Sequence, residues 1–258
     1  LFLDPMPRMD RISGFYPEQY WWDDEWRSGL LPKLERFYRR LVLTDHVRFI
    51  TQVAHATPSK SEARILDVGC GPGTLLSLLK RMGFQVAGVD LSARAAEIAL
   101  REHGINVEVG QLERLSFPAD SFDVVLLLHT LEHVPNPREL LSEVIRILKP
   151  QGRAVVQVPN IDSIQFKFFG TRWYGLDVPR HLIDYSRSSL LGLLSGSGFD
   201  VRRVRHFNLR DNAPALASSL FPGLDPVSRA VRLRQRGSRE TAIGGWFRRF
   251  AYLKIVLL

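Results

Sequence analysis

Short apolar runs alternate with helical repeats of apolar side chains over residues 63–160. Such runs are typical of strands buried on both faces of a parallel sheet. The segments between them repeat apolar residues every three or four positions, as a helix with one buried face does. The predicted strands span residues 64–68, 85–90, 105–109, 122–128 and 153–158, and the helices between them end near residues 82, 103 and 148. This alternation predicts an α/β fold with a doubly wound, mostly parallel sheet and helices on both faces.

Residues 1–60 precede this alternation and are predicted to form a helical and aromatic N-terminal cap. Apolar side chains over residues 30–50 follow helical spacing. Residues 16–22 are dense in aromatic side chains. Two interpretations are open: these rings fold over a ligand as a lid, in which case Tyr20 contacts the substrate, or they extend the core.

Residues 61–210 are predicted to form the main domain. Ser186 is expected to cap a helix that includes residues 190–194, and alternating valine and arginine over residues 199–207 predicts a strand near the sheet edge. Residues 211–258 are predicted to be a basic, amphipathic C-terminal extension. Its helix either lies on an anionic membrane surface or packs on the protein's own domain.

The chain has 258 residues, of which 45% are hydrophobic and 24% charged, as in an ordinary globular protein. The formal net charge is +8, yet residues 200–258 alone hold 12 lysine and arginine residues against four acidic ones. The charge excess therefore belongs to the C-terminal part, and no nucleic-acid partner is expected. This basic segment is the part of the chain that would contact an anionic membrane surface.

The chain has one cysteine, Cys70, which excludes a disulfide framework and fits a reducing compartment. The N-terminal stretch has no long apolar run of the kind that marks a secretory signal. No segment reaches the ~20 apolar residues that a membrane-spanning helix needs. We therefore expect a cytoplasmic protein, peripheral at the inner membrane face where its C-terminal segment meets lipid.

The first predicted strand runs directly into alternating glycines, Asp67-Val-Gly69-Cys-Gly71-Pro-Gly73. Leucines at helical spacing follow, so the stretch predicts strand, tight turn and helix. Glycine adopts backbone angles that a β-carbon forbids and lets a ligand approach bare backbone, and the helix start adds unpaired N–H donors. The third glycine of a dinucleotide fingerprint would fall at Thr74, which argues against a nicotinamide cofactor.

The second predicted strand ends in an acid, Asp90. A carboxylate at this place can accept hydrogen bonds from both hydroxyls of a ribose. Leu91 follows and could lie on an adenine face. Because parallel strands end at the same edge of a sheet, Asp90 and the glycine turn are expected to form one site.

The Asp67–Gly73 stretch resembles motif I of the class I S-adenosylmethionine (SAM) dependent methyltransferases, whose domain is Rossmann-like. The resemblance covers residues 63–207 and includes the stretches 117–123, 129–137 and 149–152. It implies SAM as the cofactor, with Asp67 near the ammonium group, Asp90 on the ribose and Cys70 as a small packing residue. The cofactor-binding residues that it implies are Asp67, Gly69, Cys70, Gly71, Gly73, Asp90, Leu91, Gln111 and Leu112.

Within this superfamily the chain is most similar to methyltransferases with a Pro-Arg-His-Leu element, here residues 179–182. The element lies in a long loop rich in aromatic and titratable side chains, and such loops are usually functional. Trp173, Tyr174 and Arg180 are predicted to contact the substrate. Arg180 either receives an acidic group of the substrate or pairs with Asp177.

Methyl transfer to an oxygen needs the acceptor's proton removed, which suits histidine. His181 in the loop and His129 at the end of the fourth strand are the predicted catalytic residues. The alternatives are that His181 is structural and that His129 only shapes the pocket. His129, Glu132 and His133 together could bind a divalent metal, but the resemblance places an acid where His129 stands, so no metal is predicted.

The sequence thus predicts a SAM-dependent methyltransferase that acts at oxygen on a small-molecule, glycan or lipid-linked acceptor. The alternative is a SAM-binding or membrane-docked partner protein without turnover, because the chain carries no unmistakable base. A nicotinamide-dependent oxidoreductase is a third reading, against which the glycine spacing argues.

Overall fold

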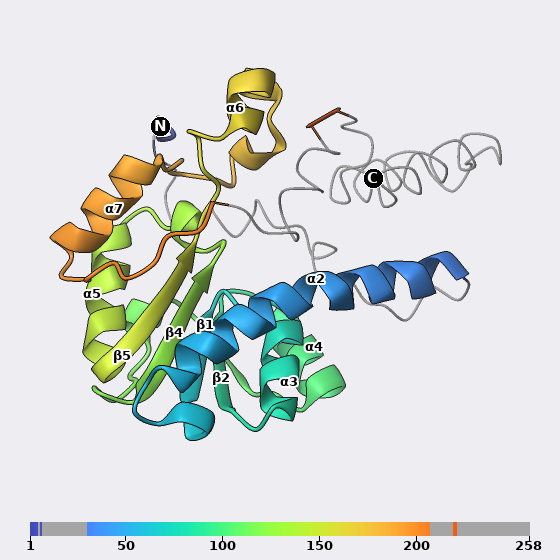
Figure 1. Ribbon diagram of the computed structural model, residues 1–258, viewed down its shortest axis with the longest axis vertical. Coiled ribbons are helices and arrows are strands. Elements are labelled where there is room, and N and C mark those ends of the chain that lie inside the picture. Colours follow the sequence, from blue (N-terminus) through green and yellow to red (C-terminus); the bar gives the residue numbers. More distant parts are fainter. Residues whose placement is uncertain (5, 7–29, 207–218, 221–258) are drawn as a thin grey trace. The chain divides into compact units, whose positions relative to one another are not determined.

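The computed structural model describes residues 1–4, 6, 30–206 and 219–220 (Figure 1). The chain divides into two compact units. Unit 1 holds Leu1–Asp162 and Asp177–His206, and unit 2 holds Ser163–Leu176 together with Phe207–Leu258. Tyr20 and the basic helix predicted near the C-terminus lie outside the described residues. The domain boundaries near residues 60 and 210 remain predictions.

Unit 1 is built on a parallel sheet of five strands, counted over the described residues. The strands are β1 Arg64–Val68, β2 Gln85–Asp90, β3 Val107–Val109, β4 Phe122–Leu128 and β5 Leu148–Gln157. Their order is β3-β2-β1-β4-β5, and each neighbouring pair is parallel. The order reverses between β1 and β4, and ligands of such sheets bind beyond the carboxyl ends of the strands at this point. The predicted doubly wound α/β fold is confirmed.

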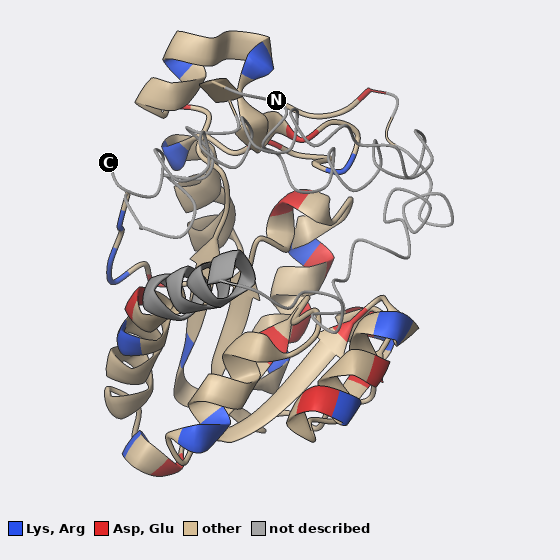
Figure 2. Ribbon diagram, turned by 90° about the vertical axis from the view of Figure 1, so that its right-hand side faces the viewer, with Lys and Arg blue, Asp and Glu red and all other residues tan. Residues whose placement is uncertain are grey.

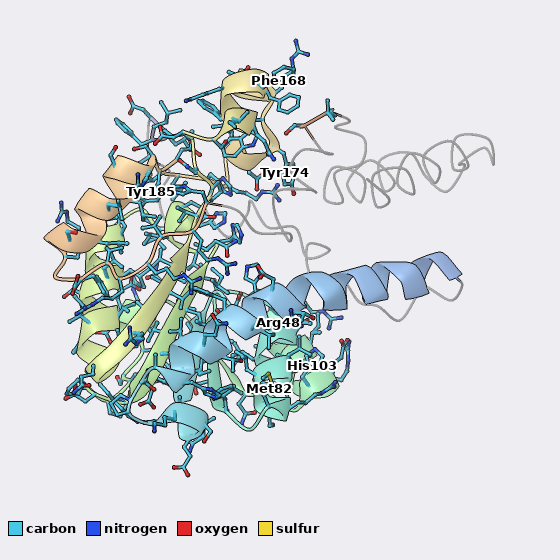
Figure 3. The ribbon with its side chains drawn as sticks, viewed as in Figure 1. Arg48, Met82, His103, Phe168, Tyr174 and Tyr185 are labelled. Carbon is cyan, nitrogen blue, oxygen red and sulfur yellow. The ribbon has the colours of Figure 1, made fainter. Side chains whose placement is uncertain are left out.

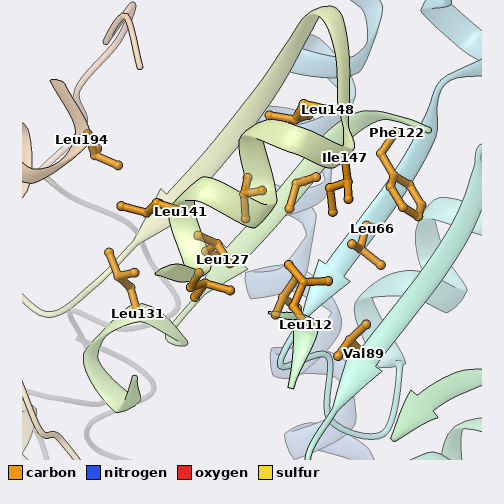
Figure 4. Packing of buried hydrophobic residues seen from close by; sticks show 14 of the residues in the cluster. Leu66, Val89, Leu112, Phe122, Leu127, Leu131, Leu141, Ile147, Leu148 and Leu194 are labelled. Carbon is orange, nitrogen blue, oxygen red and sulfur yellow. The ribbon is translucent and has the colours of Figure 1, made fainter. Parts of the chain in front are cut away.

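Helices flank the sheet (Figure 1). They are α2 Leu30–His55, α3 Thr74–Arg81, α4 Ala93–His103, α5 Pro137–Ile147 and α7 Arg187–Gly196. One buried cluster joins α2 and α3 to alternate residues of the central strands, such as Ile65 and Leu126. A second cluster joins α5 and α7 to the residues between them, such as Leu66 and Leu127 (Figure 4). Successive strand residues point to opposite faces, so each central strand contributes to both clusters.

Serine side chains start two of these helices, and the cap predicted at Ser186 is one of them. The Ser92 hydroxyl accepts a hydrogen bond from Ala95 N at the start of α4. Ser186 caps α7 and forms a capping box with Ser189. Among the helices of the described residues, none combines the length and the apolar character that crossing a membrane requires.

Asp123 ties together the amino-terminal ends of three strands. Its carboxylate accepts hydrogen bonds from Arg64 N at 2.8 Å, Ser59 Oγ at 2.5 Å and Lys149 Nζ at 2.8 Å. Burial alone would raise the pKa of this carboxyl, but these three donors hold it below its usual value. Asp123 therefore fixes the edge of the sheet opposite to the glycine turn.

The predicted edge strand over residues 199–207 is wrong for the part that the structure describes. Residues 199–206 carry no regular secondary structure. Arg203 and Arg205 instead place their guanidinium groups over the ring of Phe49 in α2, at 5.4 and 5.2 Å from its centroid. Alternation of valine and arginine predicts a strand with one buried side, but in this segment it is Phe199 and Val201 that pack against the core, and residues 202–206 are exposed.

Acidic and basic residues are interspersed along the helices of the described residues (Figure 2). Several are paired along one helix, as Arg94 is with Glu97 at 3.1 Å and Arg146 with Glu143 at 2.5 Å. This mixture agrees with the neutral balance expected before residue 200.

Unit 2 is described over the short helix α6 Ile164–Phe169 and the turns that follow it. Trp173 is its buried anchor: the indole N–H donates to Gln165 Oε1 at 3.2 Å, and the ring meets Phe166 edge to face. Tyr174 N donates to Ser219 Oγ. Phe168 projects from α6 and is 79% exposed (Figure 3).

Candidate functional site

The turn between β1 and α3 has the backbone that the alternating glycines predict. Gly69, Gly71 and Gly73 have φ values of 79°, 53° and 73°, which only glycine adopts without strain. The N–H groups of Gly69 and Cys70 donate to Val89 O of β2 at 2.7 and 3.1 Å. The turn is thereby held beside the end of β2.

Gly69 is also fixed by the end of β4. A Cβ at this position would lie 2.7 Å from Thr130 Oγ1. The Thr130 hydroxyl in turn donates to Val68 O at 2.6 Å. The turn therefore packs against both of the strands that flank β1, which is the position that the reversal of strand order assigns to a ligand.

Asp90 joins the two turns at this edge of the sheet. One carboxylate oxygen accepts from Gly71 N at 2.8 Å and the other from Ser92 N at 2.8 Å. The side chain is buried, and burial raises its pKa although the backbone donors act against the shift. A carboxylate has about four lone-pair positions, so two backbone bonds leave acceptor capacity for hydroxyl groups.

Asp67 and Cys70 line the inner side of the turn. Asp67 is buried at the end of β1. Burial raises the pKa of the Cys70 thiol, and the negative charges of Asp67 and Asp90 raise it further. Cys70 Sγ also fills the space that a Cβ on Gly88 would need. Cys70 therefore remains a neutral thiol and packs, as the sequence predicts, with no character of a nucleophile.

The residues predicted to meet an adenine ring differ in exposure. Leu91 is 54% exposed directly beyond Asp90, and Gln111 is partly exposed after β3. Leu112 is only 1% exposed, and its side chain belongs to the core cluster under α5. Leu112 can thus present only its backbone to a ligand, whereas Leu91 offers an apolar side chain.

A line of polar side chains runs from α2 to the end of β4. His46 Nε2 lies 2.8 Å from Gln157 Oε1, and Gln157 Nε2 lies 2.7 Å from His129 Nε2. His129 Nδ1 lies 3.3 Å from Glu132 Oε1. His129 has a positive φ of 57°, a rare conformation that turns the chain sharply after β4. Its imidazole therefore has polar groups at both nitrogens.

Glu132 lies at the centre of a buried histidine cluster. It is 1% exposed, and among the described residues neither carboxylate oxygen has a donor in hydrogen-bonding geometry. Burial would raise its pKa, but His129, His133 and His181 together hold it below the usual value. The rings of His133 and His181 meet edge to face at 4.8 Å. The buried carboxylate thus has imidazole rings as its polar neighbours.

The Pro-Arg-His-Leu element closes over this cluster. His133 Nδ1 lies 2.9 Å from Arg180 O, so Nδ1–H donates to this carbonyl. Burial lowers the pKa of His133, which favours the neutral ring. Arg180 pairs with Asp177, and His181 Nε2 lies 3.9 Å from Asp177 Oδ2. Of the two roles open for Arg180, the structure thus contains the internal ion pair.

A family model described as a methyltransferase domain matches residues 34–204 of this chain. The chain belongs to the methyltransferase domain family. The match covers the sheet, the glycine turn and the histidine cluster, and it agrees with the class I SAM-dependent methyltransferase fold predicted from the sequence.

Curated relatives of this methyltransferase domain carry related names. The mitochondrial ubiquinone biosynthesis O-methyltransferase of Schizosaccharomyces pombe is 34% identical over 53% of this chain and 49% of its own length. Ubiquinone biosynthesis O-methyltransferase of Burkholderia multivorans is 30% identical over 55% of this chain and 66% of its own. The matched part thus spans about half to two thirds of these relatives.

Solved structures show the same fold. A SAM-dependent methyltransferase from Archaeoglobus fulgidus is 28% identical, with a TM-score of 0.52 over 63% of this chain and 69% of that one. The cyclase SpnF, at 24% identity, superimposes with a TM-score of 0.54 over 71% of this chain and 68% of its own. The fold is therefore shared with a protein named for a different reaction, so the site must carry the functional argument.

The edge of the sheet in this methyltransferase domain fits SAM, the cofactor of the family. Asp90 retains acceptor capacity for the ribose hydroxyls, and Leu91 is exposed beside it. The glycine turn presents backbone in place of side chains, and Asp67 lies behind it. These residues would hold SAM, and when bound it would supply a methyl group on a positively charged sulfur.

Glu132, His133 and His181 are the residues that could hold a metal. They offer one ligand atom each, all within 4.8 Å of one another. One carboxylate and two imidazoles are a donor set that divalent cations accept. The sequence had grouped Glu132 and His133 with His129 for this role, whereas the structure places His181 beside them.

Three predicted substrate contacts do not belong to the described part of unit 1. Trp173 and Tyr174 belong to unit 2, and Tyr20 lies outside the described residues. His46 and Gln157 are not among the residues predicted to be functional, although Gln157 lies near the end of the strand predicted over residues 153–158. The position of Gln157 near the end of a predicted strand indicates that it can reach the ligand edge. No feature of the sequence around His46 indicates a functional role.

Proposed function

We propose that the protein is a SAM-dependent methyltransferase that methylates an oxygen atom of a small molecule. The observation that supports it most directly is Asp90, which is bonded to Gly71 N while keeping acceptor capacity at the switch point of the sheet. The family match and the names of the relatives support the same reaction class.

The acceptor is proposed to be an aromatic hydroxyl on a quinone-type precursor. This extends to the present chain what the names of its relatives state, ubiquinone biosynthesis by an O-methyltransferase. An aromatic hydroxyl is a weak nucleophile until it loses its proton, so the site must supply a base. Lipid-linked or glycan acceptors remain within the same proposal, because the residues that would contact them are the same loop residues.

His181 is proposed to take the acceptor's proton. As the oxygen–methyl bond forms and the sulfur–methyl bond breaks, the hydroxyl proton moves to the imidazole and later to water. The carboxylates of Glu132 and Asp177 lie near the His181 ring, with Asp177 Oδ2 3.9 Å from His181 Nε2. The buried surroundings exclude water from the reacting oxygen, and the protein's further contribution is orientation.

An assay with methyl-labelled SAM tests the proposed function. With a panel of water-soluble catechols and their isoprenoid-substituted forms, we expect labelled product and one S-adenosylhomocysteine for each methyl transferred. His181→Asn is expected to lower kcat by about 10²–10⁴-fold, whereas His206→Asn, an exposed histidine, serves as the matched control. Binding of SAM without any labelled product would favour the partner protein without turnover.

Membrane contact is proposed for the delivery of a lipid-linked acceptor. Ile164 and Phe168 of α6 are 85% and 79% exposed, Lys167 lies between them, and the C-terminal part of the chain is strongly basic. Apolar side chains beside lysine and arginine suit an anionic bilayer surface. Sedimentation with vesicles tests it: binding to anionic vesicles and not to zwitterionic ones is expected, and Phe168→Ser should weaken it.

A further inference from the structure

Gln157 is the only side chain in the described residues that contacts both His46 and His129 through its amide group. Its Oε1 lies 2.8 Å from His46 Nε2 and its Nε2 lies 2.7 Å from His129 Nε2. His129 N also donates to Gln157 O at 2.9 Å, so the two residues are paired through backbone as well as side chain. The position of Gln157 relative to His129 is therefore fixed.

The amide group of Gln157 decides which atoms donate and which accept in these two hydrogen bonds. An amide nitrogen only donates and an amide oxygen only accepts. His46 Nε2–H must then donate to Gln157 Oε1, and Gln157 Nε2–H must donate to His129 Nε2. His129 Nε2 is therefore an acceptor, and a neutral His129 carries its proton on Nδ1.

Glu132 distinguishes this arrangement from its reverse. With the amide turned round, His129 Nε2 would carry the proton and Nδ1 would turn a lone pair toward Glu132 Oε1, 3.3 Å away. A lone pair facing a buried carboxylate is repulsive, whereas Nδ1–H facing it is attractive. Glu132 and Gln157 therefore favour the same tautomer from opposite sides of the ring.

We infer that Gln157 is a positioning residue that, with Glu132, holds His129 as the neutral Nδ1–H tautomer and so withholds it from proton transfer. The lone pair that a general base would use is already engaged by the amide of Gln157. The inference rests on the proposed methyltransferase function and deepens it. Of the two histidines predicted to be catalytic, His181 takes the proton, and His129 shapes the site.

Nitrogen NMR of the ligand-free protein tests the tautomer without any turnover. The ¹⁵N shifts of an imidazole separate a protonated nitrogen from one with a lone pair, and His129→Asn assigns the signals. Near neutral pH we expect His129 protonated at Nδ1 and unprotonated at Nε2. A proton on Nε2 would overturn the inference. Because SAM is absent, this result is independent of whether the proposed function holds.

Gln157→Glu tests the role of the amide. A carboxylate cannot donate, so His129 must then carry a proton on Nε2, and its Nε2 signal should move to the protonated position. Gln85→Glu makes the same change at an exposed site at the start of β2 and should leave the His129 signals in place. Unchanged His129 signals in folded Gln157→Glu would overturn the inference.

Whether the tautomer of His129 matters for methyl transfer is tested by measuring turnover. A proton on Nε2, with Glu132 keeping one on Nδ1, turns His129 into an imidazolium between two carboxylates, at the edge of the sheet where the cofactor is proposed to bind. We expect kcat to fall at least about tenfold in Gln157→Glu and to stay within about twofold in Gln85→Glu. A shifted tautomer with unchanged kcat would show that the tautomer has no role in the reaction. Absence of turnover in the parent protein would instead count against the proposed function and leave the NMR result standing.

Discussion

Asp90 is the residue on which cofactor binding depends most. Its two oxygens accept from Gly71 N and Ser92 N, so an amide in its place would turn an N–H₂ group toward one backbone donor. Hydrogen bonds to a charged group are worth about 1.5–3 kcal/mol each. We therefore expect Asp90→Asn to weaken SAM binding by roughly 10–100-fold, measured by calorimetry.

The control for Asp90 is Asp200→Asn, which removes an exposed carboxylate paired only with Arg202 in the described residues. It should bind SAM as the parent protein does. Equal SAM affinity for Asp90→Asn and the parent would remove the ribose role from Asp90.

In the glycine turn, the energetic cost of the left-handed backbone and the cost of a steric contact can be measured separately. Gly69 and Gly104 both have positive φ, at 79° and 61°. A Cβ on Gly69 would meet Thr130 Oγ1 at 2.7 Å, whereas one on Gly104 would meet nothing within 4 Å. Gly104→Ala should cost about 1–2 kcal/mol for the left-handed backbone. Gly69→Ala should cost a further 1–3 kcal/mol, about the range for overpacking.

Urea unfolding of the two glycine variants measures both costs. Because the backbone penalty is common to both, their difference reports the contact with Thr130. Equal free energies of unfolding for the two variants would mean that β4 does not hold the turn.

Elements whose signals are local were predictable from the sequence. The runs that end at Val68, Asp90 and Leu128 predicted the strands of the ligand edge, because burial on both faces leaves a continuous apolar pattern. The contact between His46 and Gln157 was not predictable, since 111 positions separate them and no periodicity links a helix face to a strand end. The strand predicted over residues 199–207 was wrong in its described part for the same reason: Arg203 and Arg205 contact Phe49, far away in the chain, and no local pattern shows this.

Acid stability of the whole unit is expected to depend on Asp123. Its pKa is held below the usual value near 3.9, so its charge stabilises the fold above that pH, and this contribution is lost as the pH falls through the lowered pKa. Asp123→Asn should lose about 1.5–3 kcal/mol at pH 7 and progressively less below pH ~4. Tm measured against pH tests this, with exposed Asp120→Asn as control. A Tm difference that persists at pH ~2 would assign the effect to packing.

Ligand binding should be visible in the stability of the whole molecule. A ligand that binds only the folded state at about 100 times its Kd adds about 2.7 kcal/mol. At roughly 2–4 °C per kcal/mol for a chain of this size, Tm should rise by about 5–10 °C. SAM is expected to give this rise and NADH none, because the turn has Thr74 where a dinucleotide fingerprint needs its third glycine. Asp90→Asn should lose most of the SAM-induced rise, measured as the difference between its own Tm with and without SAM. A rise with NADH in place of SAM would assign the switch point of this sheet to another cofactor and, with it, another reaction.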